Sequence, residues 1–174
     1  MKTHPFSWED VEEIMCSIPP LNLSVLIYTR PANGLEAKFS LPYCVATFLV
    51  HGKLDLSHFE ERALNDQQVK QLMEKVKVVP DENLGELIKA TDILAPTDVQ
   101  VKLKNQTISK RMLEARGSAS FPLPNTEIVE KFRACAGRVL APEKVDEAVG
   151  LISSLESLPH VTALMDALNR AEEA

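Results

Sequence analysis

The sequence predicts an α+β fold, with a small mixed or antiparallel sheet and packed helices, followed by an all-helical tail. Two changes in the spacing of apolar residues indicate this class. At residues 76–80 and 99–103, apolar and polar residues alternate, which is typical of strands with one buried face. From residue 125 onward, apolar residues recur at intervals of three and four, which is typical of amphipathic helices. We therefore divide the chain into residues 1–124 and residues 125–174.

The clearest single element is a helix at residues 40–51. Ser40 can cap its N-terminus, Pro42 lies in the first turn, where a missing N–H costs little, and Gly52 can end it. Apolar side chains occur on all its sides, which indicates burial on most of its surface. His51 falls at the C-terminus, where the partial negative charge of a helix suits an imidazolium.

Local patterns predict the other elements of the first part. We interpret four runs of alternating or mixed polarity as strands: residues 11–18, 76–80, 99–103 and 108–113. We expect three further helices: residues 21–28, residues 57–64 behind a capping box of Ser57 and Glu60, and a run that begins at Asp66. Loops are expected at residues 30–35 and 115–124, whereas residues 81–97 fit either one helical turn or a flap.

The tail is predicted to hold three helices. Asn125 can cap the first, Pro142 can begin the second and Pro159 can begin the third. Three apolar stripes within so short a segment can bury only part of one another. We therefore expect the tail to pack on another structure.

Composition narrows the classes of function and the compartment. The net charge of −6 disfavours a nucleic-acid partner, which needs a basic face. No apolar run approaches the roughly 20 residues of a membrane helix, and the first ten residues have no apolar core of a signal peptide. Cys16, Cys44 and Cys135 are odd in number and widely spaced, so we expect a reducing compartment: the cytoplasm by default, with an organelle matrix left open.

Several kinds of catalytic and metal site find no support in the sequence. The histidines (His4, His51, His58 and His160) show no helical metal-ligand spacing, so we expect no metal. Glycine-rich phosphate loops and a GxSxG nucleophile elbow are absent. Cys44 lies inside the apolar helix, where a thiolate is disfavoured and a small core side chain is the natural interpretation.

Tyr43 is the best candidate for a functional side chain. It lies in the first turn of the helix at residues 40–51, and a helix N-terminus favours anions. Its phenol can donate a hydrogen bond or a proton to a ligand there. Lys38 and Ser40 can add a cation and a hydroxyl, which makes a carboxylate-binding corner. The alternative is a tyrosine that packs its ring and hydrogen-bonds the backbone.

The run from Gly34 to Ala46, GLEAKFSLPYCVA, closely resembles a motif of the MmgE/PrpD family. This family includes 2-methylcitrate dehydratases, cis-aconitate decarboxylases and iminodisuccinate epimerases. The resemblance extends to residues 10–14, 72–78, 131–136 and 152–168. Arg116-Gly117-Ser118 is similar to a family loop, although residues 119–124 depart from the usual continuation. From its residues alone this tripeptide could contact an anion, but a surface loop is the favoured interpretation.

The resemblance implies a domain organisation. In the family a large all-helical domain precedes a smaller α+β lid, and the last helices return to the large domain. It also implies that the reaction uses no metal or other cofactor and that the enzyme is commonly a homodimer. The catalytic histidines and lysines would come mainly from the large domain. Tyr43 would face the active site as a hydrogen-bond or proton donor, with Lys38 and Ser40 binding the substrate. His4-Pro5 is only superficially similar to a family motif, and we transfer no role to it.

The sequence therefore predicts the C-terminal part of a lyase for small di- or tricarboxylic acids. Its expected partners are that substrate, a helical domain or subunit, and a second copy of the chain, but no nucleic acid or membrane. We expect it to be inactive alone. The alternative is a non-catalytic module that binds another protein through its helical tail, and a degenerate product without function stays open.

Overall fold

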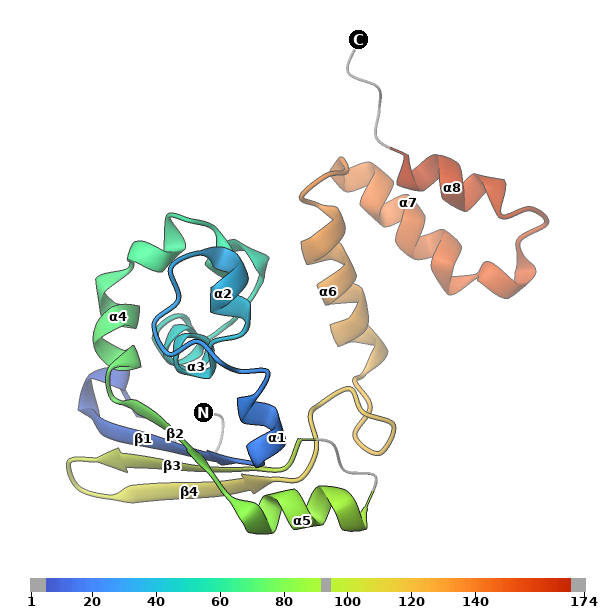
Figure 1. The fold of residues 1–174 in the computed structure, drawn as a ribbon. Helices are drawn as coiled ribbons and strands as arrows, with labels where there is room; N and C mark the ends of the chain where they lie inside the picture. Colours follow the sequence, from blue (N-terminus) through green and yellow to red (C-terminus); the bar gives the residue numbers. More distant parts are fainter. Residues whose placement is uncertain (1–5, 92–94, 170–174) are drawn as a thin grey trace. The chain divides into compact units, whose positions relative to one another are not determined.

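The structure is a computed structural model that describes residues 6–91 and 95–169. The chain divides into two compact units, Met1–Phe121 and Pro122–Ala174, and each is described by itself. The first unit combines a sheet with helices, and the second is all helical (Figure 1). The predicted α+β class is confirmed.

A four-stranded mixed sheet in the order β2-β1-β3-β4 forms the base of the first unit. Its strands are β1 (Val11–Ile18), β2 (Val76–Pro80), β3 (Thr97–Leu103) and β4 (Thr107–Met112). β1 is parallel to β2 and antiparallel to β3, and β3 and β4 form an antiparallel hairpin. All four predicted strands are confirmed. The parallel pair requires a long crossover, and that crossover carries the candidate site.

The central strand β1 departs from simple alternation for a local reason. Val11, Ile14, Cys16 and Ile18 are all buried, although the first two are three residues apart. The register against β3 shifts between Val11 and Glu13, so a bulge inserts one residue and turns both side chains to the core. Because the buried side chains lie on the strand that has neighbours on both sides, β1 anchors the core of the unit.

Helices from the crossover cover one side of this sheet (Figure 1). The α-helices of the unit are α1 (Pro20–Leu23), α2 (Gly34–Lys38), α3 (Leu41–His51), α4 (Gln67–Met73) and α5 (Glu82–Ala90). Two short 3₁₀ turns, η2 (Leu56–Phe59) and η3 (Ala63–Asn65), lie between α3 and α4, and a third, η1 (Trp8–Asp10), precedes β1. α3 packs on α4, and together they give Tyr43, Ala46, Val69 and Leu72 to the core.

Two predictions for the crossover were wrong because polar side chains cap short helices at positions that the sequence analysis did not consider. The helix predicted at residues 57–64 is replaced by η2 and η3, since Asp55 rather than Ser57 accepts the first free N–H groups. The loop predicted at residues 30–35 ends in α2, because the Asn33 side chain accepts from the Glu36 N–H and caps a short helix.

Two further elements differ in extent from the predictions. The helix predicted at residues 21–28 is limited to the four residues of α1. The ambiguous segment at residues 81–97 forms α5, whose N-terminus is capped by the Asp81 carboxylate. Residues 92–94 lie outside the described part of the chain.

The second unit contains α6 (Asn125–Ala136), α7 (Pro142–Ser153), η4 (Leu155–Ser157) and α8 (Thr162–Leu168). The start at Pro142 is confirmed. Asn125 does not cap α6: Pro124 occupies the capping position without a side-chain bond. Pro159 does not begin the last helix, since α8 starts three residues later at Thr162.

Few side chains of the second unit are buried. Val145, Ala148 and Ala167 are its buried apolar residues, and Arg133 of α6 forms an ion pair with Asp146 of α7. Seven larger apolar side chains are exposed: Ile128, Val139, Ile152, Leu155, Val161, Met165 and Leu168. Among the described residues, no helix has the length and apolar character needed to cross a membrane.

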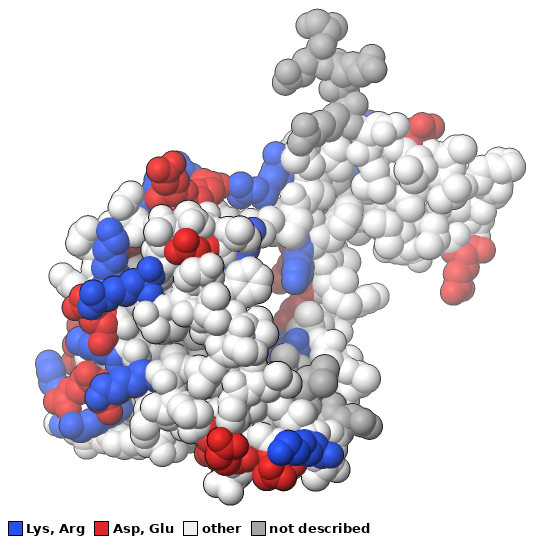
Figure 2. Space-filling model, viewed as in Figure 1, with Lys and Arg blue, Asp and Glu red and all other residues white. Residues whose placement is uncertain are grey.

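The first unit also exposes apolar side chains. In Figure 2 a broad uncharged area covers the side that carries α1, α2 and α3, with charged residues along its margins. The exposed large apolar residues of this part of the chain are Leu21, Val25, Ile27, Leu35, Phe39 and Phe48.

Gly34 is fixed by a close approach between two backbone segments. A Cβ added at this position would lie 1.9 Å from the carbonyl oxygen of Phe59, a distance that real contacts do not reach. The first residue of α2 therefore packs directly on the end of η2.

Replacing Gly34 by alanine is expected to destabilise the first unit by about 1–3 kcal/mol, the usual cost of overpacking. Chemical denaturation measures this loss. Gly150→Ala is the matched control, because its added Cβ meets nothing within 4 Å and the residue lies inside α7. Equal stability of Gly34→Ala and the unsubstituted chain would contradict the described approach of α2 to η2.

Candidate ligand-binding site around Tyr43

The first turn of α3 holds Tyr43 in place through its backbone. Ser40 is fully buried, and its Oγ accepts from the Tyr43 N–H at 3.3 Å. At the other end Gly52 adopts a left-handed conformation (φ 72°), and its N–H donates to the Phe48 carbonyl. The predicted caps of this helix are confirmed.

The Tyr43 side chain is buried and hydrogen-bonded to the backbone. It is 3% exposed, its hydroxyl donates to the His58 carbonyl oxygen at 2.5 Å, and its ring lies 6.2 Å from the Phe59 ring. Burial raises the pKa of the phenol. The hydroxyl is therefore protonated at neutral pH and acts as a hydrogen-bond donor. This geometry is that of the alternative given above, a tyrosine that packs its ring and hydrogen-bonds the backbone.

The other two residues of the predicted carboxylate corner lie elsewhere. Lys38 is exposed at the end of α2, with its Nζ 5.9 Å from the centre of the Phe59 ring, within the range of a cation–π contact. The Ser40 hydroxyl is used as the helix cap. Of these three side chains, Tyr43 lines the pocket described below and Lys38 and Ser40 do not, and their roles toward a substrate stay predictions.

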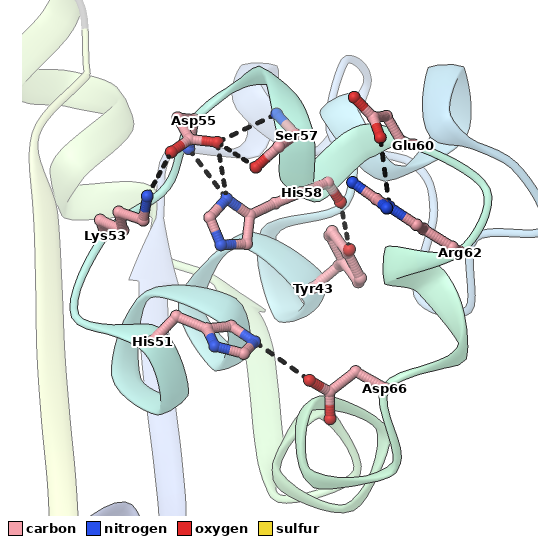
Figure 3. A network of polar contacts seen from close by, with 9 residues as sticks. All are labelled: Tyr43, His51, Lys53, Asp55, Ser57, His58, Glu60, Arg62 and Asp66. Carbon is pink, nitrogen blue, oxygen red and sulfur yellow. Dashed lines mark hydrogen bonds and ion pairs between the residues drawn. The ribbon is translucent and has the colours of Figure 1, made fainter. Parts of the chain in front are cut away.

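A polar network surrounds the Tyr43 hydroxyl instead (Figure 3). Asp55 accepts from the N–H and the hydroxyl of Ser57 and pairs with Lys53 at 3.0 Å. The Ser57 hydroxyl and then Lys53 hold the pKa of Asp55 well below its usual range. The Nδ1 atom of His58 lies 3.0 Å from Asp55 Oδ1 and 3.2 Å from the Asp55 backbone nitrogen, which completes a capping box. This box fixes the segment whose carbonyl receives Tyr43.

A second imidazole lies beside the first. The His51 Nε2 atom donates to Asp66 Oδ2 at 3.1 Å, and the His51 and His58 rings have centres 5.2 Å apart. His51 is at the C-terminus of α3, as predicted. The carboxylate of Asp66 also accepts from the N–H groups of Gln68 and Val69. The same side chain therefore caps α4 and orients the His51 ring.

These groups line a pocket of about 230 Å³ between α3 and the chain that follows it. α3 contributes Tyr43, Thr47 and His51, and the facing residues are Ser57, His58, Arg62, Ala63, Asp66 and Val69. The residues from α3 are four apart, which places them on one face of a helix. Sequence analysis did not use that spacing and missed Thr47, although it could have indicated the site, whereas the partners from residues 57–69 show no regular pattern.

The loop at residues 115–124 forms a separate hollow. Its walls are Ala95 and residues 114–120. The Ser118 hydroxyl donates to Glu114 at 2.5 Å, and that bond lowers the pKa of the Glu114 carboxyl. Glu114 and Arg116 both line this hollow, and the Ser118 hydroxyl is bonded to the Glu114 carboxylate, so the anion contact expected at Arg116-Gly117-Ser118 stays a prediction.

The described residues offer little for metal or thiolate chemistry. Within residues 6–91 and 95–169, no group of three or more His, Cys, Asp or Glu side chains is placed to hold a metal ion. His4 lies outside the described residues. Burial raises the pKa of the Cys44 thiol, and that of Cys16 to about 11, so both favour the neutral form.

Comparison with known protein families identifies the family of this chain. Residues 1–156 match the family model of the MmgE/PrpD C-terminal domain. The chain belongs to the MmgE/PrpD family.

Curated relatives of this MmgE/PrpD chain are cis-aconitate decarboxylases. The human protein is 28% identical over 156 residues, which cover 88% of this chain and 31% of the relative. The mouse protein is 26% identical over 160 residues, covering 91% and 32%. The Aspergillus terreus (strain NIH 2624 / FGSC A1156) protein is 26% identical over 140 residues, covering 80% and 28%. The chain thus spans about a third of the length of these relatives.

The raised pKa of Tyr43 has a measurable consequence for stability. Since the folded-state pKa lies above the ordinary value of about 10, the unfolded chain loses this proton first as the pH rises. The stabilisation is fully present below about pH 10 and is lost as the pH rises through the folded value.

We expect ultraviolet titration of a Tyr28→Phe variant, which retains Tyr43 as its one tyrosine, to show phenolate forming above pH 10. Unfolding in parallel samples separates ionisation of the folded chain from exposure of the ring. Ionisation of the folded chain near pH 10 would contradict the burial of this phenol.

Proposed function

We propose that this chain is the lid-type C-terminal part of an MmgE/PrpD lyase that acts on small di- or tricarboxylic acids. The family match over residues 1–156 carries the proposal. Similarity to three proteins named cis-aconitate decarboxylase favours decarboxylation. Dehydration of a 2-methylcitrate-like acid is the alternative reaction. Turnover of cis-aconitate or of 2-methylcitrate distinguishes the two.

Tyr43 is proposed as the donor that this domain supplies. Decarboxylation breaks a C–C bond and leaves an electron pair that must receive a proton, and dehydration requires protonation of a leaving hydroxide. A buried neutral phenol suits either task, and a well-placed proton donor contributes about 10²–10⁴-fold. Its present acceptor, the His58 carbonyl, keeps the hydroxyl oriented until a substrate oxygen competes for it.

The rest of the catalytic machinery is proposed to lie in a helical domain that pairs with this chain. The chain matches only 28–32% of the length of its relatives, so about two thirds of each relative has no counterpart here. Apolar side chains exposed on α1–α3 and on α6–α8 are the surfaces proposed to dock on that domain. Burying them would remove the exposed apolar area that both units carry.

A second candidate function is a non-catalytic module that binds another protein through the second unit. The exposed side chains of Ile128, Val161 and Met165 favour it, because each is at least half exposed. Under this alternative, Ile128→Asp abolishes binding of the partner while Tyr43→Phe leaves it unchanged.

The experiment that tests the lyase proposal is a substitution at Tyr43 in the assembled enzyme. With the helical domain of a family member co-expressed, Tyr43→Phe is expected to lower kcat on cis-aconitate about 10²–10⁴-fold. Loss of the double-bond absorbance follows the reaction. Tyr28→Phe is the matched control, since Tyr28 lies before α2 and outside the pocket. Full activity of Tyr43→Phe would exclude the proposed donor.

A further inference from the structure

The buried hydroxyl of Thr47 has no hydrogen-bond partner in the part of the chain that the structure describes. Thr47 lies inside α3, its residue is 1% exposed, and its Oγ1 atom bonds to no described residue. A helical threonine commonly returns its hydroxyl to the carbonyl four residues earlier, but that bond is not made here. Since an unpaired buried hydroxyl lowers stability, its place in this helix needs a reason other than packing.

The Tyr43 oxygen is the group placed to use this donor. Tyr43 and Thr47 are four residues apart on α3, so their side chains lie on one face, and both line the same pocket. The Tyr43 hydroxyl donates its one proton to the His58 carbonyl, and the lone pairs of its oxygen can still accept (Figure 3). Thr47 lies near enough to this phenol to oppose the rise in its pKa.

The charge on the Tyr43 oxygen decides how strong a bond from Thr47 would be. Hydrogen bonds to an ionised acceptor are shorter and roughly twice as strong as those between neutral groups. A hydroxyl close to this oxygen therefore stabilises the phenolate more than the neutral phenol. An interaction that strengthens as charge develops is one that lowers the barrier of a reaction.

We propose that Thr47 is a positioning residue for Tyr43: its hydroxyl donates a hydrogen bond to the phenolate oxygen that forms when Tyr43 gives up its proton. The O–H bond of Tyr43 breaks, its electron pair stays on the oxygen, and the proton goes to the substrate. The phenolate takes a proton from water after the product leaves. This catalytic use rests on the proposed function, whereas the hydrogen bond from Thr47 is a property of the chain alone.

The charged groups around the phenol do not replace this donor. Asp66 and the Cys44 thiol raise the pKa of Tyr43, so they disfavour the phenolate. The other titratable groups near the pocket contact one another in pairs: Arg62 with Glu60, His51 with Asp66, and His58 with Asp55. A substitution at Thr47 alters none of these charges, so a change in the ionisation of Tyr43 would report on the Thr47 hydroxyl.

The test is titration of Tyr43 in the purified chain. A Tyr28→Phe chain grown with 3-fluorotyrosine carries one labelled residue, whose fluorine NMR signal follows phenolate formation. Fluorine makes the phenol more acidic, and circular dichroism at each pH identifies the folded samples. Adding Thr47→Val is expected to raise the midpoint by about one pH unit, because the phenolate loses a hydrogen bond. An unchanged midpoint would overturn the proposal.

Two further variants separate the hydroxyl from packing. Thr47→Ser keeps the donor, so its midpoint is expected to stay close to that of the Tyr28→Phe parent. A rise as large as that of Thr47→Val would overturn the assignment to the hydroxyl. Thr107→Val, at an exposed position of β4, is the matched control for the loss of a threonine hydroxyl.

The catalytic use is tested in the chain paired with the helical domain of a family member. Thr47→Val is expected to lower kcat on cis-aconitate about tenfold, the same factor as one pH unit, and to leave KM nearly unchanged. In a Tyr43→Phe background it is expected to have no further effect, because no phenolate forms. An equal fall in both backgrounds would overturn this use of Thr47. Full activity of Tyr43→Phe would overturn the proposed function, whereas the titration tests the hydrogen bond separately.

Discussion

The hydrogen bond from the Tyr43 hydroxyl to the His58 carbonyl ties α3 to the irregular chain that follows it. η2 is also held by its own capping box and by the packing of Phe59 against the core and α2. The bond needs three other features: a cap that sets the first turn of α3, a capping box that fixes residues 55–58, and a glycine that lets α2 reach the end of η2. The candidate pocket is the space these three contacts leave open.

This arrangement gives one tyrosine two properties that catalysis uses. Burial keeps its phenol protonated, and a backbone acceptor keeps it oriented. A backbone carbonyl is a neutral acceptor, so it directs the proton without removing it. The neighbouring histidines are in turn oriented by Asp55 and Asp66. If the chain is the lid that we propose, this site is already ordered before the lid meets the rest of the enzyme.

Sequence reasoning reached the parts of this structure that local signals determine. The strand at residues 99–103 follows from alternation, and the helix closed by Ser40 and Gly52 follows from its capping residues. It missed α2, although Asn33 and Glu36 are a local capping pair, and it predicted a longer helix in place of η2, because it took Ser57 rather than Asp55 as the cap. The partners of Tyr43 come from a segment without periodicity, so only tertiary contacts reveal them.

The most direct test of the central claim is turnover of cis-aconitate by the purified chain alone and by the chain co-expressed with the helical domain of a family member. The proposal predicts negligible turnover alone and clear turnover in the pair, because the chain covers only about a third of its relatives. Turnover by the chain alone at the rate of the pair would contradict it, since the whole catalytic site would then lie within these 174 residues.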